Sequence, residues 1–432
     1  MQLRYRLLAL SLLALALFAH PARAVPSFAE QTGQPCSACH VGAFGPQLTA
    51  FGRQFKLTGY TLNDGSDHIP LAVLAQFSFT HTAADQDPKA APGFRANDNP
   101  TLDEASLFYA GALTEHAGVF AQALYSGVGH AYAWGDLDLR YADTTTLAGK
   151  DLIWGFTFNN DPTVQDLWNT TPVWGFPFAH SFLAPTPSAS AVVDGTLGQQ
   201  VVGLGAYTQW NDLLYLEFDL YRSLGQPVLT PLGTLDARQL DGDNPYWRAA
   251  LQHSFGDHYV ELGTYGMDAS LFPRATQSFG TDHALDTAVD GSYQWTFLND
   301  YTLAAYSTYI LETRNENASH PLLGALASDS LKTFRTNVSF TVEDTYTANV
   351  QRFNMVGTTD PAVFGGSPNS AGWIGELDYT PTGKSTSFLP SWLNVKFTLQ
   401  YVDYTRFDGT IDHASDKNTL YLLSWFAVPL DF

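Results

Sequence analysis

The chain has 432 residues and carries 42 acidic against 21 basic side chains, which gives a net charge of −21 with neutral histidines. This charge excludes a general nucleic-acid binder, because such proteins need a basic surface. Hydrophobic residues make up 45% of the chain, yet beyond residue 24 no apolar run approaches the roughly 18 residues of a membrane helix. The composition therefore excludes a helical membrane protein, and its apolar content excludes a disordered chain.

The first 24 residues have the pattern of an export signal. Arg4 and Arg6 give a positive start, residues 7–18 form an apolar core, and Ala22 and Ala24 frame an A-x-A cleavage site. Residues 1–24 are therefore predicted to be a signal peptide, with the mature chain beginning at Val25. An uncleaved membrane anchor is the alternative, although the apolar core is short for a span.

The only two cysteines, Cys36 and Cys39, stand directly before His40 in the pattern C-x-x-C-H. In this motif the two thiols add to the two vinyl groups of one haem, and the adjacent histidine ligates the iron. The motif predicts one covalently attached c-type haem with His40 as its proximal ligand. A C-x-x-C redox pair without haem is the alternative, but no βαβ pattern surrounds it.

Residues 25–70 are predicted to form this haem segment, which is short for an independent core. The haem is therefore expected to take cover from the rest of the chain. His68 is the only other histidine in the segment and is a candidate distal ligand. A solvated loop histidine is the alternative interpretation of His68.

Residues 48–57 are predicted to form a short helix whose apolar face packs on the porphyrin. Arg53 and Lys56 lie in the same stretch and could neutralise the haem propionates. Solvated charges beside an apolar face explain them equally well. The methionines that could serve as distal ligands, Met267 and Met355, lie far along the chain in predicted strands.

From residue 71 onward, apolar and polar residues alternate, which indicates strands with one apolar and one polar face. In residues 214–221, for example, Leu214, Leu216, Phe218 and Leu220 alternate with Tyr215, Glu217, Asp219 and Tyr221. Approximate strands are predicted at residues 71–83, 103–115, 117–129, 134–145, 150–159, 199–209, 212–222, 244–255, 258–268, 281–295, 300–313, 331–342, 345–355, 372–380, 393–405 and 417–432.

The connections between these strands alternate between tight turns and long loops. Residues 84–102, 160–198, 223–243 and 314–330 are long, whereas residues 210–212, 256–258, 299–300 and 343–345 are tight. Residues 381–392 are long for a periplasmic turn. Together with an aromatic final strand ending at Phe432, this pattern predicts an all-β fold over residues 71–432, a porin-like outer-membrane barrel of about 16 strands. A soluble β-sandwich would also alternate, but it would not show this loop asymmetry.

The predicted lumen is acidic, so it should attract cations. Its inward-facing acids are Asp136, Asp138, Glu217, Asp219, Glu376 and Asp378, opposed by Arg140, Arg335 and Lys396. The long loop 160–198 is rich in aromatic residues, including Trp168, Trp174 and Phe178. An apolar loop of this length has a reason to fold inward, where it could narrow the pore or shield the haem.

Taken together, residues 28–33, the C-x-x-C-H motif and residues 51–60 resemble the fused monohaem cytochrome-porins of iron-oxidising bacteria. The resemblance is specific only over about residues 25–61, although the domain order matches throughout. Because a barrel crosses about 30 Å of hydrocarbon, a single haem has to lie within the lumen, and residues 25–70 acting as a plug would satisfy this. The resemblance implies a bacterial outer-membrane location. It further implies that the protein oxidises extracellular Fe(II) and passes electrons to a periplasmic c-type cytochrome.

The sequence is compatible with three functions of the predicted haem. The haem could serve an iron(II) oxidase, an electron conduit for another redox partner, or a cation-preferring porin in which it is structural or sensory. The resemblance carries over Cys36, Cys39 and His40 but no distal ligand. Residues 41–48 also look longer than the usual spacing in that family.

Overall fold

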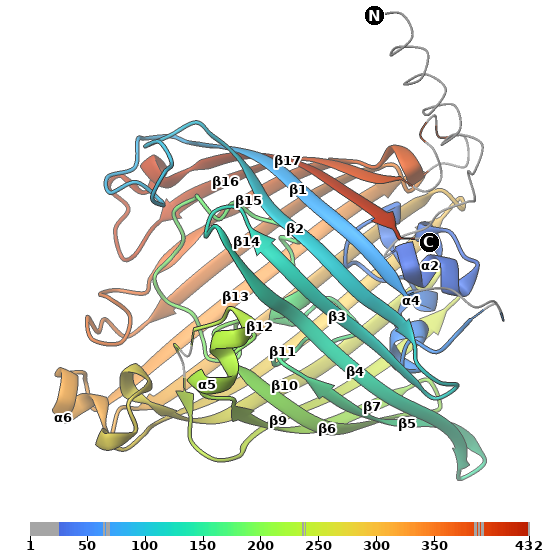
Figure 1. The fold of residues 1–432 in the computed structure, drawn as a ribbon, viewed down its shortest axis with the longest axis horizontal. Helices are drawn as coiled ribbons and strands as arrows, with labels where there is room; N and C mark the ends of the chain where they lie inside the picture. The colour runs from blue at the N-terminus through green and yellow to red at the C-terminus, as the bar shows by residue number, and fades with distance from the viewer. Residues whose placement is uncertain are drawn as a thin grey trace, which may run out of the picture.

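The computed structural model describes residues 26–63, 65, 70–235, 237, 239–383, 387, 389 and 393–430. The predicted signal peptide, the candidate distal ligand His68 and the final Phe432 lie outside the described residues. The described chain consists of a short helical N-terminal segment followed by one large antiparallel sheet (Figure 1).

The N-terminal segment contains helices α2 (Pro26–Thr32), α3 (Cys36–Cys39) and α4 (Ala50–Leu57), and the 3-10 turn η1 (Val41–Ala43). Helix α4 begins where the Thr49 side chain accepts a hydrogen bond from the Gly52 backbone N–H at 3.2 Å. This N-cap explains why the helix begins two residues later than the predicted start at residue 48.

The sheet contains seventeen strands in its described part, of which β8 is only two residues long. The strands are β1 (Leu71–Thr82), β2 (Asn99–Ala112), β3 (Ala117–Ser126), β4 (Ala131–Leu147), β5 (Lys150–Asn159), β6 (Val201–Trp210), β7 (Leu214–Ser223), β8 (Gln239–Leu240), β9 (Asn244–Phe255), β10 (His258–Phe272), β11 (Asp282–Phe297), β12 (Tyr301–Asn315), β13 (Ser328–Val342), β14 (Tyr346–Gly357), β15 (Ser370–Tyr379), β16 (Asn394–Arg406) and β17 (Thr419–Pro429).

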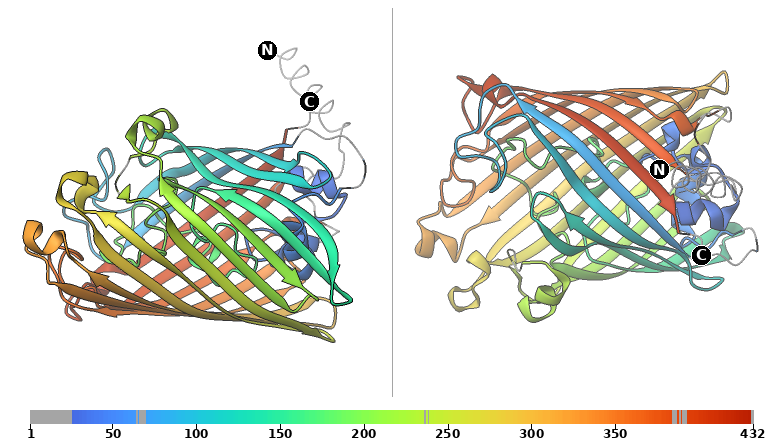
Figure 2. Two further views of the ribbon diagram at one scale, coloured as in Figure 1. Left: turned by 90° about the horizontal axis from the view of Figure 1, so that it is seen from below. Right: turned by 45° about the horizontal axis from the view of Figure 1, so that its top comes forward.

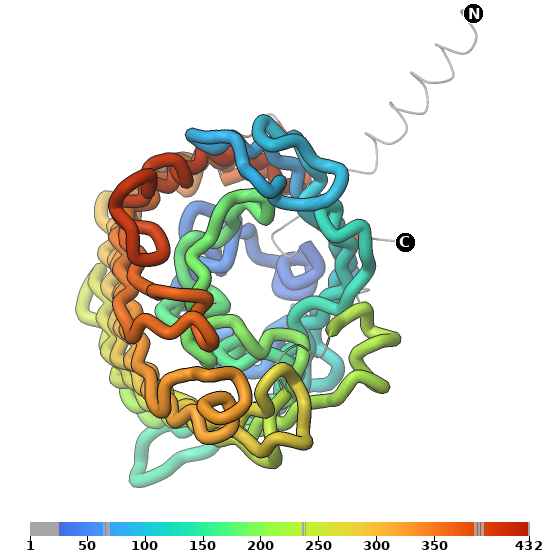
Figure 3. The backbone as a smooth tube through the Cα atoms, turned by 90° about the vertical axis from the view of Figure 1, so that its left-hand side faces the viewer, coloured from blue at the N-terminus to red at the C-terminus, as the bar shows by residue number. Residues whose placement is uncertain are grey.

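The sixteen longer strands close into a barrel, which confirms the predicted fold class and strand number. Each pairs antiparallel with its neighbours in the chain, apart from β7, which pairs with β9, and β1 pairs with β17 to complete the ring. Short strand β8 pairs only with the end of β10. Figure 3 looks along this ring from its long-loop end.

The predicted alternation between faces is present in the barrel wall. In β7, Leu216 and Phe218 are exposed on the outer face, whereas Glu217 and Asp219 are buried on the inner face. A closed barrel with an apolar outer face and a polar lumen is the architecture of bacterial outer-membrane proteins. The protein is therefore an outer-membrane barrel with a porin-like channel architecture.

None of the helices in the described part of the chain is long and apolar enough to cross a membrane.

The two ends of the barrel differ, as predicted. Tight turns such as that between β9 and β10 lie at one end, and the long connections lie at the other. The N-terminal segment and the last strand's end lie together at the tight-turn end (Figures 1 and 2). Because outer-membrane barrels place short turns in the periplasm, this is the periplasmic end. The connection from β15 to β16 is longer than the other turns there and contains η6 (Pro381–Gly383).

The connections at the long-loop end contain the remaining short helical elements. These are α5 (Gln226–Leu229), η3 (Thr230–Leu232), η4 (Pro273–Ala275), η5 (Gln277–Phe279), α6 (Ser319–Leu323) and η7 (Ala414–Lys417). Residues 160–200, between β5 and β6, contain η2 (Pro172–Trp174) and are called the inner loop below.

The inner loop runs inside the ring of strands (Figure 3), as the sequence predicted for residues 160–198. The Gln165 side chain donates to Asp219 at 3.0 Å, and the Val192 and Val193 backbone N–H groups donate to Glu312 and Asp286 at 2.7 Å. These acceptors are buried side chains of the barrel wall. The wall's acidic groups therefore bind the backbone and side chains of the loop and hold it in the lumen.

Candidate functional site

The C-x-x-C-H motif forms a single turn of chain. Cys36 and Cys39 are the first and last residues of α3, and the His40 backbone N–H donates to the Cys36 carbonyl oxygen at 2.9 Å. Neither cysteine is in a disulfide. The Cys36 thiol donates to the Asn394 side-chain oxygen of β16 at 3.2 Å, which fixes α3 to the barrel wall.

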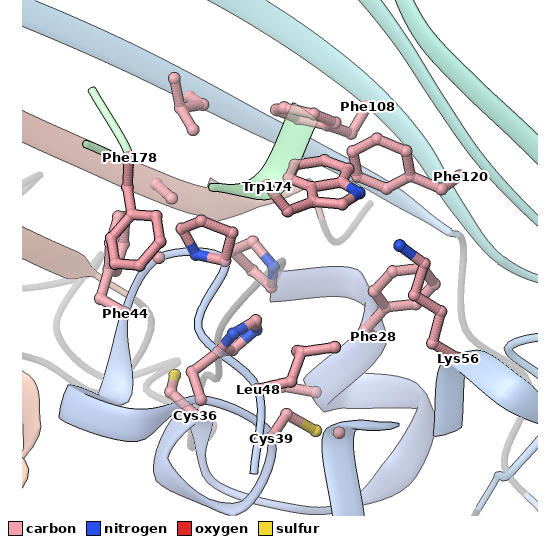
Figure 4. Close-up of a pocket in the computed structure, with 18 of the residues that line it drawn as sticks. Phe28, Cys36, Cys39, Phe44, Leu48, Lys56, Phe108, Phe120, Trp174 and Phe178 are labelled. Carbon is pink, nitrogen blue, oxygen red and sulfur yellow. The ribbon is translucent and has the colours of Figure 1, made fainter. Parts of the chain in front are cut away.

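All three motif residues line one cavity of about 370 Å³, called the inner cavity below. This volume lies in the range of roughly 300–1,000 Å³ that is usual for sites of small molecules and cofactors. Figure 4 shows Cys36 and Cys39 on one side of it and Trp174 and Phe178 of the inner loop on the opposite side. The inner cavity is therefore enclosed by three parts of the chain, with the barrel wall as the third.

Aromatic rings make up much of the remaining lining. Phe28 of α2 stacks on Tyr60, with ring centroids 5.2 Å apart, and meets Phe55 of α4 edge to face at 4.9 Å. Phe108 of β2 and Phe120 of β3 contribute from the wall, with centroids 5.6 Å apart. Such a lining suits a flat, largely apolar ligand.

The His40 side chain is half-buried and lines the inner cavity. Burial lowers the pKa of His40 to about 4, although the nearby Gln47 backbone raises it slightly. The imidazole is therefore neutral at physiological pH, and a neutral imidazole is the form that ligates a metal.

Burial also raises the pKa of the Cys39 thiol to about 11. A reactive redox cysteine needs a lowered pKa, because the thiolate is the nucleophile. The environment of Cys39 therefore does not favour a free dithiol redox pair, the alternative interpretation of this motif.

Helix α4 is held against α3 by a close backbone contact. A Cβ atom added at Gly52 would lie 2.2 Å from the Cys39 carbonyl oxygen, so only glycine fits there without a shift. The Thr49 backbone N–H donates to the same carbonyl at 2.9 Å. The position of α3, and with it that of both cysteines, therefore depends on α4.

Arg53 and Lys56, the two cations of α4, have different surroundings. Arg53 donates to the Leu48 carbonyl at 3.0 Å and to Gln294 of β11 at 3.1 Å, and its guanidinium lies 3.7 Å from the Tyr259 ring centroid. Its partners hold the helix to the barrel wall, and it does not line the inner cavity. Lys56 does line it, so Lys56 alone of the predicted pair is placed to meet a propionate there.

The Lys56 ammonium is also tied to the inner loop. It donates to the Val164 carbonyl at 2.6 Å and to the Asp166 carbonyl at 2.8 Å, and it lies 4.9 Å from the Trp174 ring centroid. Burial, followed by repulsion from Arg140, lowers its pKa to about 7. The Trp174 indole N–H donates to the same Val164 carbonyl at 2.6 Å. This carbonyl of the inner loop therefore holds both Lys56 of α4 and Trp174 of the cavity lining.

Asn169 of the inner loop connects to the chain just after the motif. Its side-chain oxygen accepts from the Leu48 backbone N–H at 3.0 Å, and its amide donates to the Pro46 carbonyl at 2.8 Å. Gln47 donates to Tyr306 of β12 at 2.8 Å. The segment between the motif and α4 therefore follows a defined path between the inner loop and the barrel wall.

These residues fit a covalently held haem. Two thiols and a neutral histidine from one turn face an aromatic cavity of suitable volume. Lys56 supplies a cation at the same cavity. Among the described lining residues, His40 is the only histidine and methionine is absent. Met267 and Met355 lie in β10 and β14, as predicted, away from this site.

Several lining residues were not predicted from the sequence: Phe44, Tyr60, Phe108, Phe120, Asn169 and Trp425. One signal was available for Phe108. It is 7% exposed and faces inward between the outward Leu107 and Tyr109, so it places an apolar side chain where the alternation calls for a polar one. Such inward apolar positions mark where the wall contacts protein or ligand instead of water.

Among the described residues, no group of three or more histidine, cysteine, aspartate or glutamate side chains is arranged to hold a metal ion.

No family model matches the chain, and no curated protein matches it. Solved structures with similar folds include the OmpF porin of Salmonella typhi in complex with daunomycin, at 11% identity and a TM-score of 0.46, covering 83% of this chain and 97% of that chain. The outer-membrane channel DcaP of Acinetobacter baumannii matches at 10% identity and a TM-score of 0.45, covering 83% and 96%. OmpT of Vibrio cholerae matches at 10% identity and a TM-score of 0.44, covering 83% and 97%.

Proposed function

We propose that this protein transfers electrons from extracellular Fe(II) to a periplasmic c-type cytochrome through one haem attached at Cys36 and Cys39 and ligated by His40. The observation that carries the proposal is the C-x-x-C-H turn facing an aromatic cavity inside the barrel. When bound, the haem supplies a one-electron redox centre.

The location of the motif supports delivery to the periplasm. Helices α2 to α4 lie at the periplasmic end, and Ser27 of α2 donates to the Ala110 carbonyl of β2 at 2.8 Å. The segment is thus held within reach of a soluble partner outside the barrel mouth. Because the hydrocarbon layer is about 30 Å thick, an external donor has to enter the lumen to approach this end.

The charges of the lumen support a cationic donor. Asp138, Glu217, Asp219, Glu376 and Asp378 are all buried on the inner face, as predicted. Arg140 and Lys396 are also inward, and they pair with Asp138 at 2.8 Å and with Asp378 at 3.1 Å. Five carboxyl groups against two cations give this set a negative formal charge, which favours Fe²⁺ over an anionic donor.

A cation-preferring porin with a structural or sensory haem is the second candidate, since a polar sixteen-stranded barrel has the size of an aqueous channel. The inner loop argues against free conduction, because it occupies the lumen and is bonded to the wall at many points. Single-channel conductance separates the two readings. A low conductance is expected for the electron-transfer protein, and a large open current would favour the porin.

The direct test is anaerobic stopped-flow absorption of the purified, haem-loaded protein mixed with Fe(II). We expect rapid appearance of a reduced c-type spectrum, whereas a Cys36→Ala/Cys39→Ala protein is expected to carry no covalent haem on a denaturing gel. Reduction by dithionite but not by Fe(II) would refute Fe(II) as the donor and leave the haem assignment intact. Absence of haem stain in the unaltered protein would refute the assignment itself.

A further inference from the structure

A second cavity lies on the other side of the inner loop. It encloses about 400 Å³ and is called the outer cavity below; Pro177 and His180 of the loop line it, together with inward residues of β13 to β17. Phe178, which stands between them in the sequence, lines the inner cavity. A single segment of the inner loop therefore separates the two cavities. Figure 4 shows the Phe178 side chain in the inner cavity, which the two cysteines also line.

The outer cavity carries little net charge. Among its described lining residues, Asp194 and Arg335 neutralise each other, because the guanidinium donates to the two carboxylate oxygens at 2.8 Å and 2.6 Å. His180 is open to the cavity, and burial within the barrel lowers its pKa, so the ring is neutral at physiological pH. The cavity therefore lacks the unpaired carboxylates that would attract a bare divalent cation.

Its walls combine apolar surface with a buried hydroxyl that lacks a protein partner. Phe353 and Tyr404 meet edge to face, with ring centroids 5.7 Å apart, and both line the cavity. The Thr333 hydroxyl lines it too, and this side chain is 2% exposed with no hydrogen-bond partner within the described chain. Ligand sites have this composition, with apolar and aromatic walls and a few convergent polar groups.

His180 of the inner loop adds a further polar side chain to the lining. His180 packs against the Phe182 ring, with centroids 5.1 Å apart. A neutral imidazole can both donate and accept a hydrogen bond, so together with the Thr333 hydroxyl it can bind carbonyl or hydroxyl oxygens. A buried hydroxyl without a partner costs free energy, which a ligand oxygen would recover.

We propose that the outer cavity binds a small uncharged aromatic molecule carrying carbonyl or hydroxyl groups, of the quinone and hydroquinone class. The flat ring packs against the aromatic wall, and its oxygens meet the polar side chains. A redox role for this ligand, one loop away from the haem-attachment residues, rests on the proposed function. Binding itself does not.

The test is calorimetric titration of the full-length, haem-loaded protein in detergent with duroquinone, whose fully substituted ring does not add to thiols. We expect saturable binding at one site. His180→Phe is expected to weaken binding about tenfold, and the near-isosteric Thr333→Val several-fold, since each removes one polar contact. His413→Phe is the matched control, because that histidine is on an exposed loop and its side chain is 86% exposed.

Retained heat-resistant mobility of each variant on a gel shows that the barrel has formed. Uptake that does not saturate, or that is equal in His180→Phe and His413→Phe, would overturn the proposal, because it would show partitioning into detergent. The same titration on the haem-free Cys36→Ala/Cys39→Ala protein should retain binding, and its loss there would also overturn the proposal. If duroquinone binds while Fe(II) fails to reduce the haem, the proposed function fails and this inference stands.

Discussion

Removing one buried arginine is expected to weaken the attachment of the inner loop to the barrel wall and to destabilise the protein. Arg248 of β9 is 2% exposed and pairs with Asp290 at 2.7 Å, Glu261 at 3.4 Å and Asp166 of the inner loop at 3.6 Å. Its guanidinium also lies 4.7 Å from the Trp168 ring centroid. Arg248→Met keeps much of the side-chain volume and leaves three buried carboxylates without this counter-charge. Breaking a buried ion pair in this way typically costs about 3–5 kcal/mol.

The assay is urea unfolding of the protein in lipid vesicles, followed by tryptophan fluorescence. We expect the free energy of unfolding to fall by about 3–5 kcal/mol in Arg248→Met and to recover partly when Asp290→Asn is added. Arg222→Met is the matched control, because Arg222 forms a comparable pair with Asp243 at the surface, where such pairs contribute little. Equal losses in Arg248→Met and Arg222→Met would refute the reasoning.

Three further predictions concern the N-terminal segment. In haem-free protein, the lowered pKa of Lys56, about 7, means that the unfolded chain binds the extra proton, so stability should rise with pH. Between pH 7 and pH 10.5, the free energy of unfolding of the unaltered protein should increase by about 4 kcal/mol more than that of Lys56→Met, as measured by urea titration at each pH. Parallel pH profiles of the two proteins would contradict this. Gly52→Ala should sharply reduce the covalent haem seen on a stained gel, because the new Cβ would meet the Cys39 carbonyl. Gly375→Ala is the control and should keep its haem, because a Cβ there meets nothing within 4 Å. Equal haem content in the two variants would count against the packing argument. Tyr60→Phe should lower the free energy of unfolding by about 1–3 kcal/mol, because it removes the 2.6 Å hydrogen bond to buried Asp138; Tyr132→Phe, at an exposed position, is the control.

The barrel could be predicted because its pattern is local. Alternation along a strand depends only on which face meets lipid, so β7 and β16 were located to within two residues. The errors concern strand ends beyond the apolar belt. Strand β13 begins at Ser328 instead of the predicted residue 331, because polar residues continue the hydrogen-bonded ladder after the hydrophobic pattern has ended. The two-residue β8 was missed for the same reason.

The site was predictable only in part. Its haem-binding motif is contiguous in the sequence, whereas the residues that enclose the cavity come from distant parts of the chain. Cys36, Cys39 and His40 are adjacent in sequence, and their motif identifies them without any fold. The partner of Cys36 is Asn394, which lies 358 residues further along the chain. Phe120 and Trp174 meet with ring centroids 6.1 Å apart, although they belong to a strand and a loop with no shared pattern. Contacts of this kind follow from barrel closure, which periodicity does not encode.

The position of the inner loop changes what the barrel can do. A sixteen-stranded barrel without it would be a wide channel, and a cofactor at one mouth would be far from the opposite mouth. The loop occupies part of the lumen and carries aromatic residues to the inner cavity, while its other face lines the outer cavity. An external donor thus reaches the motif only by occupying the lumen beside this loop. Pro177 and His180 line the outer cavity and Phe178 lines the inner one, so under the proposed function these residues are the ones whose substitution should affect both cavities.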